Sequence, residues 1–327
     1  MIFALLLLVG IKCEPIQKDN ECLARLNALR GIFAIEIVVG HVVRYEKTLL
    51  YPLGKFMIIS VAFFFFVSAY GMRRSLRQKE RYLNGFLLRK CGYLLVIAGV
   101  AYGVELLADA VFHLNLQYYD KSKSLLINFW EETNWYIWEL LFFYVVFYLT
   151  YRYMKKYQVI VLCIITAALA TALFLCGWKE GWYASALAFP CGLLFEEHEQ
   201  SIMAALQTKG GGTAVAALCL LGVCSLGFSQ QSLIGMVYLR NIMCIGALGI
   251  LLLLVLRVRP GNRALAFLTM RSAEIYLYQF LLLDLTAGLG LPWKPRLLAV
   301  AAGTLVLSCV VYPFDCACRG MITKERR

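Results

Sequence analysis

Long apolar stretches follow one another along the whole chain, separated by short polar connections. A helix needs about 20 apolar residues to cross the hydrocarbon of a bilayer. Only helices and closed barrels can cross it, and these stretches are too long and too uniformly apolar for barrel strands. We therefore predict an all-α polytopic membrane bundle of about ten transmembrane helices. The stretches are 30–47, 52–71, 92–112, 134–151, 158–177, 181–196, 213–229, 236–256, 272–290 and 296–314.

The composition supports this prediction. Hydrophobic residues make up 61% of the chain and charged residues only 16%, against about 25% charged in a typical soluble domain. The mean hydropathy is +0.71, and the connections are too short for an added soluble domain. We predict one transmembrane domain over residues 25–315. An extension at 1–24 that is surface-lying or disordered precedes it, and a basic cytoplasmic tail at 316–327 follows it.

The basic residues are unevenly distributed. Lysine and arginine total 32 against 20 acidic residues, for a formal net charge of +12. Most of the 32 fall on one side if the chain starts in the cytoplasm, and cytoplasmic connections are the ones enriched in Lys and Arg. Both termini are therefore predicted to be cytoplasmic. Because membrane orientation accounts for the charge, we expect no nucleic-acid partner.

The first stretch joins a cation to a histidine. Arg30 and His41 are eleven positions apart, so on a helix they return to nearly the same face, separated by a rise of roughly 16 Å. His41 then lies well inside an apolar helix. An ionisable side chain at that depth is a candidate for function, although helix–helix hydrogen bonding is the commoner role of a single membrane histidine.

The second stretch ends in small and hydroxyl-bearing residues, among them Ser68 and Tyr70, which suit either close helix packing or a ligand contact. The connection after it is the most basic of the chain. It either sets the membrane orientation alone or binds a phosphorylated ligand on the cytoplasmic side, since Arg and Lys clusters suit phosphate. The candidate cations here are Arg74, Arg77, Arg89 and Lys90.

The third stretch carries Glu105, Asp109 and His113 at spacing i, i+4, i+8, which predicts one helical face near its outer end. Glu105 and Asp109 could contact a polar acceptor in a wet outer vestibule, or the stripe could be a solvated helix end. The stripe of three side chains holds too few ligands for a metal ion. The twelve cysteines of the chain also match no zinc spacing, so we predict no metal site.

Two later stretches add polar and aromatic candidates. Trp135 and Tyr136 open the fourth stretch, where they could form an interfacial aromatic belt or stack on sugar rings. Glu139 lies deeper and is a candidate for a polar contact inside the bundle. In the ninth stretch, Tyr278 and Gln279 could point into a cavity, although hydrogen bonding between helices is an equally good interpretation.

Taken in order, these motifs resemble the acyltransferase 3 family, whose integral-membrane members acylate surface glycans. The family's first span carries an arginine, ten residues and then an essential histidine, which Arg30 and His41 match. The chain departs from the family pattern in four places. Asn27 replaces a common aspartate, Ala69 a usual glycine and Gln279 a common histidine, and Gly92 and Tyr93 occupy the area of a second arginine at the entry to the third span. Further matching segments are Phe64–Ser68, Phe86–Lys90, Trp135–Ile137 with Tyr144, and Glu274–Gln279.

The resemblance implies an O-acyltransferase that moves an acyl group, with acetyl as the expected one, from cytoplasmic acyl-CoA to a hydroxyl of an extracytoplasmic carbohydrate. His41 would be the general base, or would carry the acyl group itself, with Arg30 as its catalytic partner. The donor would contact Arg74, Arg77, Arg89, Lys90, Ser68 and Tyr70. The acceptor would contact Trp135, Tyr136, Glu139, Glu105, Asp109, Tyr278 and Gln279.

Acetyl-CoA or another acyl-CoA would be a co-substrate, with no permanently bound cofactor. The expected partners are membrane lipid, acyl-CoA and the carbohydrate acceptor, in a bacterial cytoplasmic membrane. Two other functions fit the pattern. A multi-span transporter or flippase would also need polar residues within its spans, although the sequence shows no internal repeat of the kind that carriers have. A catalytically silent acyl-CoA-binding sensor would be consistent with the changes at Asn27 and Gln279.

Overall fold

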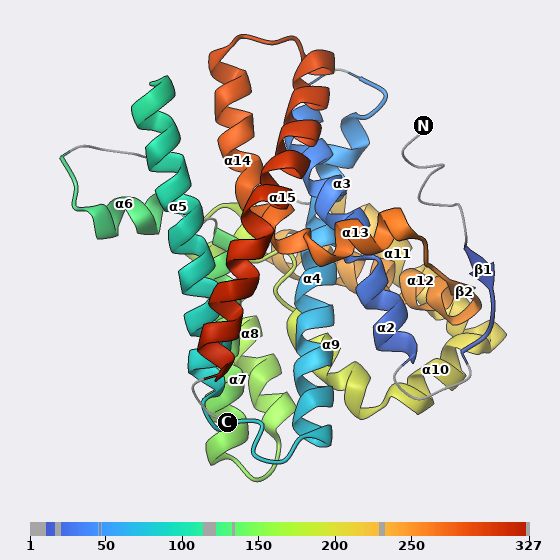
Figure 1. Cartoon of the computed structure of the whole chain (residues 1–327). Coiled ribbons are helices and arrows are strands. Elements are labelled where there is room, and N and C mark those ends of the chain that lie inside the picture. The colour runs from blue at the N-terminus through green and yellow to red at the C-terminus, as the bar shows by residue number, and fades with distance from the viewer. Residues whose placement is uncertain are drawn as a thin grey trace. The chain divides into compact units, whose positions relative to one another are not determined.

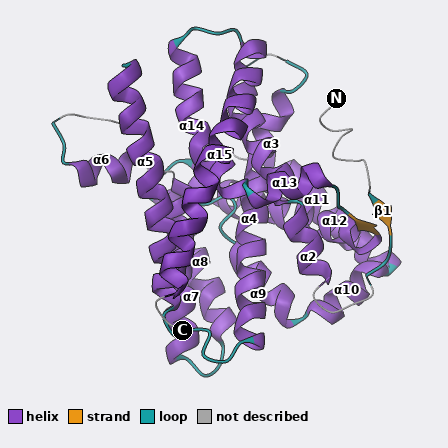
Figure 2. Ribbon diagram, in the orientation of Figure 1, coloured by secondary structure: helices purple, strands orange, loops and turns teal. Residues whose placement is uncertain are grey.

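The computed structural model describes residues 11–16, 21–44, 46, 48–113, 122–132, 135–228 and 233–324. These residues are nearly all helical, which confirms the all-α prediction (Figures 1 and 2). Most of the predicted extension, the end of the predicted tail and the first residue of the fourth stretch lie outside the described residues. The chain divides into two compact units. Unit 1 comprises 1–33, 58–83 and 146–269, and unit 2 comprises 34–57, 84–145 and 270–327.

Six helical segments of the described chain are long and apolar enough to cross a membrane. They coincide with six of the ten predicted stretches and identify a membrane protein with several spanning helices. The first segment begins earlier than predicted and joins α2 (Glu21–Ala28) to α3 (Arg30–Val43) through Leu29. The segments are Glu21–Val43, Tyr51–Gln78, Leu88–Phe112, Gln158–Leu175, Gly235–Arg257 and Trp293–Met321.

The other four stretches are also helical in whole or part, but their helices do not combine the length with the hydropathy of a spanning segment. The clearest difference is at 181–196, where a short 3₁₀ turn (Glu180–Trp182) is followed by α9 only from Ala188. With 10 residues, α9 rises about 15 Å, half of the roughly 30 Å of bilayer hydrocarbon. The count of ten spans and the orientation of the termini stay predictions. The four helices are α7 (Trp135–Tyr153), α9 (Ala188–Glu197), α11 (Lys209–Phe228) and α14 (Ser272–Gly288).

Unit 1 is built around α12 (Arg240–Arg257), which packs against α2, α9, α10 (Glu199–Gln207) and α11. Glycines bring α11 and α12 together. A side chain at Gly222 would collide with Met243, and one at Gly246 would collide with Cys219. Small residues at such crossings allow the close backbone approach by which membrane helices associate. The remaining elements are α4 (Tyr51–Gln78), α8 (Gln158–Leu175), a π-helical turn (Ile234–Leu239) and α13 (Arg263–Met270).

A single buried amide supports the irregular backbone before α9. Asn241 of α12 is fully buried and donates to the carbonyls of Tyr183, at 2.7 Å, and Val237, at 2.6 Å. Its side-chain oxygen accepts the backbone N–H of Leu187 at 2.9 Å. Non-helical backbone inside a membrane protein needs partners of this kind for its polar groups. The sixth stretch is therefore interrupted where a distant side chain replaces the helical hydrogen bonds.

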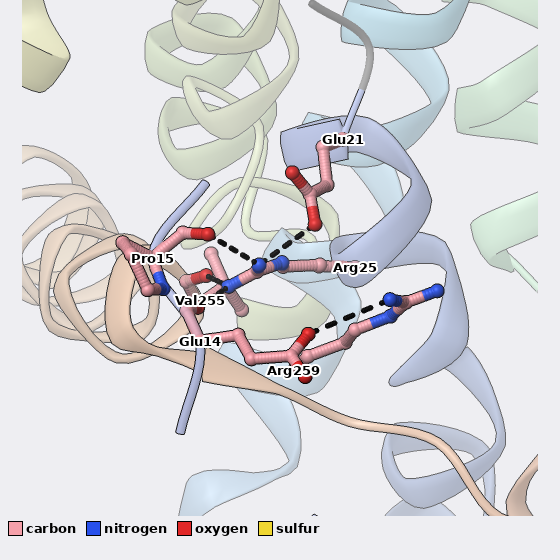
Figure 3. A network of polar contacts seen from close by, with 6 residues as sticks. All are labelled: Glu14, Pro15, Glu21, Arg25, Val255 and Arg259. Carbon is pink, nitrogen blue, oxygen red and sulfur yellow. Dashed lines mark hydrogen bonds and ion pairs between the residues drawn. The ribbon is translucent and has the colours of Figure 1, made fainter. Parts of the chain in front are cut away.

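The N-terminal residues of unit 1 are tied to α12 and to the strand that follows it. β1 (Lys12–Cys13) pairs antiparallel with β2 (Val258–Arg259). The buried Arg25 donates to the carbonyls of Val255 and Glu14, at 2.9 and 2.7 Å, and also bonds the carbonyl of Pro15 and the carboxylate of Glu21 (Figure 3). Residues 12–15 of the predicted extension are thereby attached to the core of unit 1.

Unit 2 consists of a hairpin of α14 and α15 (Trp293–Lys324) packed against α5 (Tyr93–Phe112), which a π-helical turn (Leu88–Gly92) precedes (Figure 1). It also holds α6 (Leu125–Glu132) and the first part of α7. Gly303 on α15 lets α14 approach closely, since an added side chain would meet Leu282. The core of the unit is made of Ile97, Ala98, Ala101, Ile137, Leu277, Tyr278 and Val311.

Candidate active site

The predicted catalytic pair lies on one helix. Arg30 opens α3 and His41 lies near its end, so the helical spacing between them is as the sequence predicted. The start of α3 is packed onto α4 by aromatic contacts: Phe33 stacks on Phe63 with ring centroids 4.1 Å apart. The Arg30 guanidinium lies 6.0 Å from the centre of the Phe64 ring, close enough for a cation–π attraction. Arg30 therefore contacts the Phe64–Ser68 motif within unit 1.

His41 belongs to unit 2 and is half-buried there. Its imidazole meets the Phe280 ring edge to face, with centroids 5.1 Å apart and an interplanar angle of 69°. Tyr276 lies one helical turn earlier on α14, and its ring is 6.5 Å from that of Phe280. Since Tyr276 also meets Tyr136 at 5.1 Å, an aromatic row connects His41 to α7.

A buried carboxylate lies beside this row. Glu139 is one turn along α7 from Tyr136, is 2% exposed and lies within electrostatic range of Tyr276. Neither of its oxygens has a hydrogen-bond partner among the described residues. An unpaired buried acceptor pair of this kind is costly unless a ligand or water satisfies it. Glu139 is thus placed where a polar substrate group could bind.

Tyr278 and Gln279, the two adjacent candidates on α14, have different surroundings. Gln279 is fully buried and donates to the carbonyl of Tyr276 at 3.0 Å, while its side-chain oxygen has no described partner. Tyr278 lies in the core of unit 2, close to Glu105 of α5. Neighbouring helical positions point about 100° apart, so these two residues belong to different clusters.

The cluster around Tyr278 contains carboxylates that the sequence analysis did not select. Asp315 and Glu274 lie within electrostatic range of the tyrosine, and Asp315 is buried with no described partner for either oxygen. Asp315 and Tyr278 come from opposite arms of the α14–α15 hairpin. Their meeting could not be found from local spacing, although an aspartate in an apolar stretch was a visible signal.

The predicted stripe on α5 is shorter than expected. Glu105 and Asp109 lie on the helix and are half-buried, but α5 ends at Phe112. His113 adopts a left-handed backbone with φ 52° and donates its N–H to the Asp109 carbonyl, which ends the helix. His113 is therefore the residue at which the helix ends, and the helical part of the predicted stripe holds Glu105 and Asp109.

Trp135 and Tyr136 open α7 as predicted. Their rings meet edge to face at 6.3 Å, and both are half-buried. The Tyr136 ring also contacts Tyr276, so it belongs to the row that reaches His41. Trp135 lies at the end of that row.

The donor candidates on α4 lie in a network of charges within unit 1. Tyr70 is fully buried and neighbours Cys22, Glu199 and Arg74, while Ser68 is half-buried. The Arg74 guanidinium is 2.5 Å from Glu199 of α10. Arg74 thus has a carboxylate partner from a helix 125 residues later in the chain.

Arg77 has a different carboxylate partner, Glu196 of α9, at 3.0 Å. Arg73, one turn before it, lies 3.9 Å from the same carboxylate. The sequence analysis missed both Glu196 and Glu199. The available signal was the acidic run at 196–199, which complements the basic connection after α4.

The last two donor candidates, Arg89 and Lys90, lie in the π-helical turn before α5. Such turns are uncommon in proteins overall, and those that do occur often lie at functional sites. Arg89 donates to the carbonyl of Asn84 at 2.5 Å. Phe86 begins the motif segment Phe86–Lys90 and contacts Tyr144 with ring centroids 6.1 Å apart. Two of the motif segments therefore meet within unit 2.

A comparison with protein families matches residues 23–313 to the acyltransferase domain of the acyltransferase 3 family. The match covers most of the chain and includes every site residue predicted from the sequence. The chain belongs to the acyltransferase 3 family. Comparisons with curated proteins and with solved structures gave no match. For an acyltransferase 3 protein, the row from His41 to Tyr136 in unit 2 is the candidate active site.

Proposed function

We propose that this protein is a membrane O-acyltransferase that moves an acyl group, most simply acetyl, from cytoplasmic acyl-CoA to a hydroxyl of an extracytoplasmic carbohydrate. The observation that carries the proposal is the family match over 23–313 together with Arg30 and His41 at their expected spacing on one helix. Membership of an acyltransferase family favours acyl transfer over transport or silent binding.

In the proposed reaction, the His41 imidazole accepts the proton of the acceptor hydroxyl while the hydroxyl oxygen attacks the thioester carbon. The new C–O bond forms and the C–S bond breaks. The proton held by His41 then neutralises the departing CoA thiolate, so the imidazole returns to its starting state. General base catalysis of this kind contributes typically 10²- to 10⁴-fold to a rate.

Other residues have side chains suited to bind the acyl-CoA donor and the carbohydrate acceptor. Cations on the basic connection suit the phosphates of the donor. The aromatic rings of Tyr136 and Trp135 suit a sugar ring, and the unpaired oxygens of Glu139 suit its hydroxyl groups.

The test is transfer from radiolabelled acetyl-CoA in isolated membranes. His41→Ala and His41→Gln should lower incorporation of label into carbohydrate at least 100-fold at equal protein level. The matched control is His113→Asn, which changes an exposed histidine to a residue that tolerates its left-handed backbone. Equal incorporation by native protein and both His41 variants would remove His41 from the chemistry.

A further inference from the structure

Three arginines at the end of α4 lie in different surroundings. Arg73 and Arg77 are four residues apart and share a helical face, whereas Arg74 points about 100° away from Arg73. All three lie in unit 1, as do the carboxylates that they contact. The basic connection therefore contains groups that can play separate roles.

A single carboxylate holds Arg73 and Arg77 together. Glu196 has a side chain only 1% exposed, with one oxygen 3.0 Å from Arg77 Nη2 and the other 3.9 Å from Arg73 Nε. The Arg73 guanidinium also lies over the Tyr151 ring, 5.2 Å from its centre. These three side chains together carry two positive charges and one negative charge.

Arg77 and Arg74 differ in how much of their side chains is exposed to solvent. The side chain of Arg77 is 55% exposed, so much of its guanidinium remains accessible while one nitrogen forms an ion pair with Glu196. An arginine carries five N–H donors, more than one carboxylate can satisfy. The side chain of Arg74 is 6% exposed and is paired with Glu199. Arg77 can therefore receive an anion from solvent, whereas Arg74 is enclosed.

We propose that Arg77, with Arg73 beside it, binds the nucleotide phosphates of the acyl-CoA donor, and that Glu196 positions the two guanidinium groups. The inference rests on the proposed function. The phosphates of an acyl-CoA lie on its nucleotide portion, and its pantetheine arm and thioester are uncharged. Paired guanidinium groups suit phosphate oxygens because they donate several hydrogen bonds in a fixed geometry. Arg77 then selects CoA thioesters over pantetheine thioesters, and Arg74 connects α4 to α10 without contacting the donor.

The test compares two donors on the full-length protein in nanodiscs of neutral lipid. Arg77→Ala should raise KM for acetyl-CoA roughly tenfold or more, because a charge-assisted hydrogen bond is lost. Its KM for acetyl-pantetheine and its kcat with either donor should stay unchanged. The control is Lys79→Ala, which removes an exposed positive charge two residues away. Equal changes with both donors, or none with acetyl-CoA, would overturn the phosphate site.

Glu196 is tested through its effect on the arginines. Glu196→Gln keeps the shape of the side chain but removes the charge that holds Arg73 and Arg77 together, so KM for acetyl-CoA should rise while KM for acetyl-pantetheine does not. Glu196→Asp retains the charge and should restore part of the affinity. A lower KM in Glu196→Gln would show that the carboxylate competes with the donor. A loss of thermal stability with no change in donor preference would show a structural role only.

Two further measurements distinguish donor binding from failure of the proposed function and from binding of a lipid headgroup. Adenosine 3′,5′-bisphosphate binding, measured by calorimetry, should weaken in Arg77→Ala even if native protein transfers no acetyl group. That result would keep the phosphate site while the proposed function failed. An anionic lipid headgroup offers the same phosphate chemistry. If the Arg77→Ala effect on KM occurs only in nanodiscs that contain phosphatidylglycerol, the ligand is the headgroup and the donor assignment is wrong.

Discussion

The imidazole of His41 and the ring of Phe280 meet edge to face with centroids 5.1 Å apart. The contact joins α3 to α14 across 239 positions of the chain, within unit 2. An aromatic neighbour restricts the orientation of an imidazole without competing for its proton. We therefore propose Phe280 as a positioning residue for the proposed base.

Replacing Phe280 by leucine should lower kcat roughly 2- to 10-fold and leave KM for acetyl-CoA unchanged. Edge-to-face aromatic pairs are worth about 0.5–1.5 kcal/mol beyond the area they bury, and that energy holds the imidazole in place. Steady-state kinetics with acetyl-CoA measures both constants. Phe280→Tyr retains the ring and should keep most of kcat. A leucine variant with native kcat would argue against a positioning role.

Replacing Glu139 by glutamine should lower acetyl transfer at least tenfold without lowering thermal stability. The native carboxyl group is buried with no described partner, so an amide of the same shape introduces no charge and breaks no described hydrogen bond. Transfer to the endogenous acceptor and thermal unfolding in detergent measure the two effects. Asp315→Asn is the matched control, because it neutralises another buried, unpaired carboxylate of unit 2 and should retain transfer. Native transfer by Glu139→Gln would exclude an acceptor contact.

Replacing Arg25 by alanine should lower the free energy of unfolding by roughly 3–5 kcal/mol. The change leaves the Val255 and Glu14 carbonyls and the Glu21 carboxylate without their donor (Figure 3). Arg259→Ala breaks an exposed ion pair with Glu14 and should change stability by about 0.5 kcal/mol or less. Denaturation of both variants in the same detergent tests this difference. Similar losses in the two would mean that the buried network is not stabilising.

Replacing Asn241 by alanine should destabilise unit 1 by roughly 2–6 kcal/mol, since the Leu187 N–H and the Tyr183 carbonyl lose their partner and each unsatisfied group costs about 1–3 kcal/mol. Thr213→Ala removes an exposed, local hydrogen bond and should change stability by less than about 0.5 kcal/mol. Protease accessibility at 183–187 should rise in Asn241→Ala. Unchanged protection would contradict the supporting role of the amide.

Much of the helical architecture was predictable, because each apolar stretch forms its hydrogen bonds within itself. The stretch at 181–196 shows the limit of that argument. Its residues are mostly apolar, yet the helix begins only at Ala188, and Asn241 from another helix satisfies the backbone before it. By contrast, α5 ends at Phe112, where the predicted stretch 92–112 also ends, although the left-handed backbone of His113 is not visible in the apolar pattern.

In the candidate site, too, some features were predictable from the sequence and others depend on tertiary contacts. The spacing of Arg30 and His41 follows from 3.6 residues per turn and needs no tertiary information. The selection of Arg74 and Arg77 as equivalent cations did not anticipate Glu199 and Glu196, since neither carboxylate is near them in the sequence.

The sequence by itself determined that this is a helical membrane protein of the acyltransferase 3 family and that Arg30 and His41 share one helix. Those properties depend on apolar length and helical periodicity, which are local. Only the tertiary structure decided that His41 meets Phe280, that Glu139 is buried without a partner and that Glu196 joins Arg73 to Arg77. Such pairings depend on which helices pack together, and local periodicity leaves that open because many arrangements bury the same apolar faces.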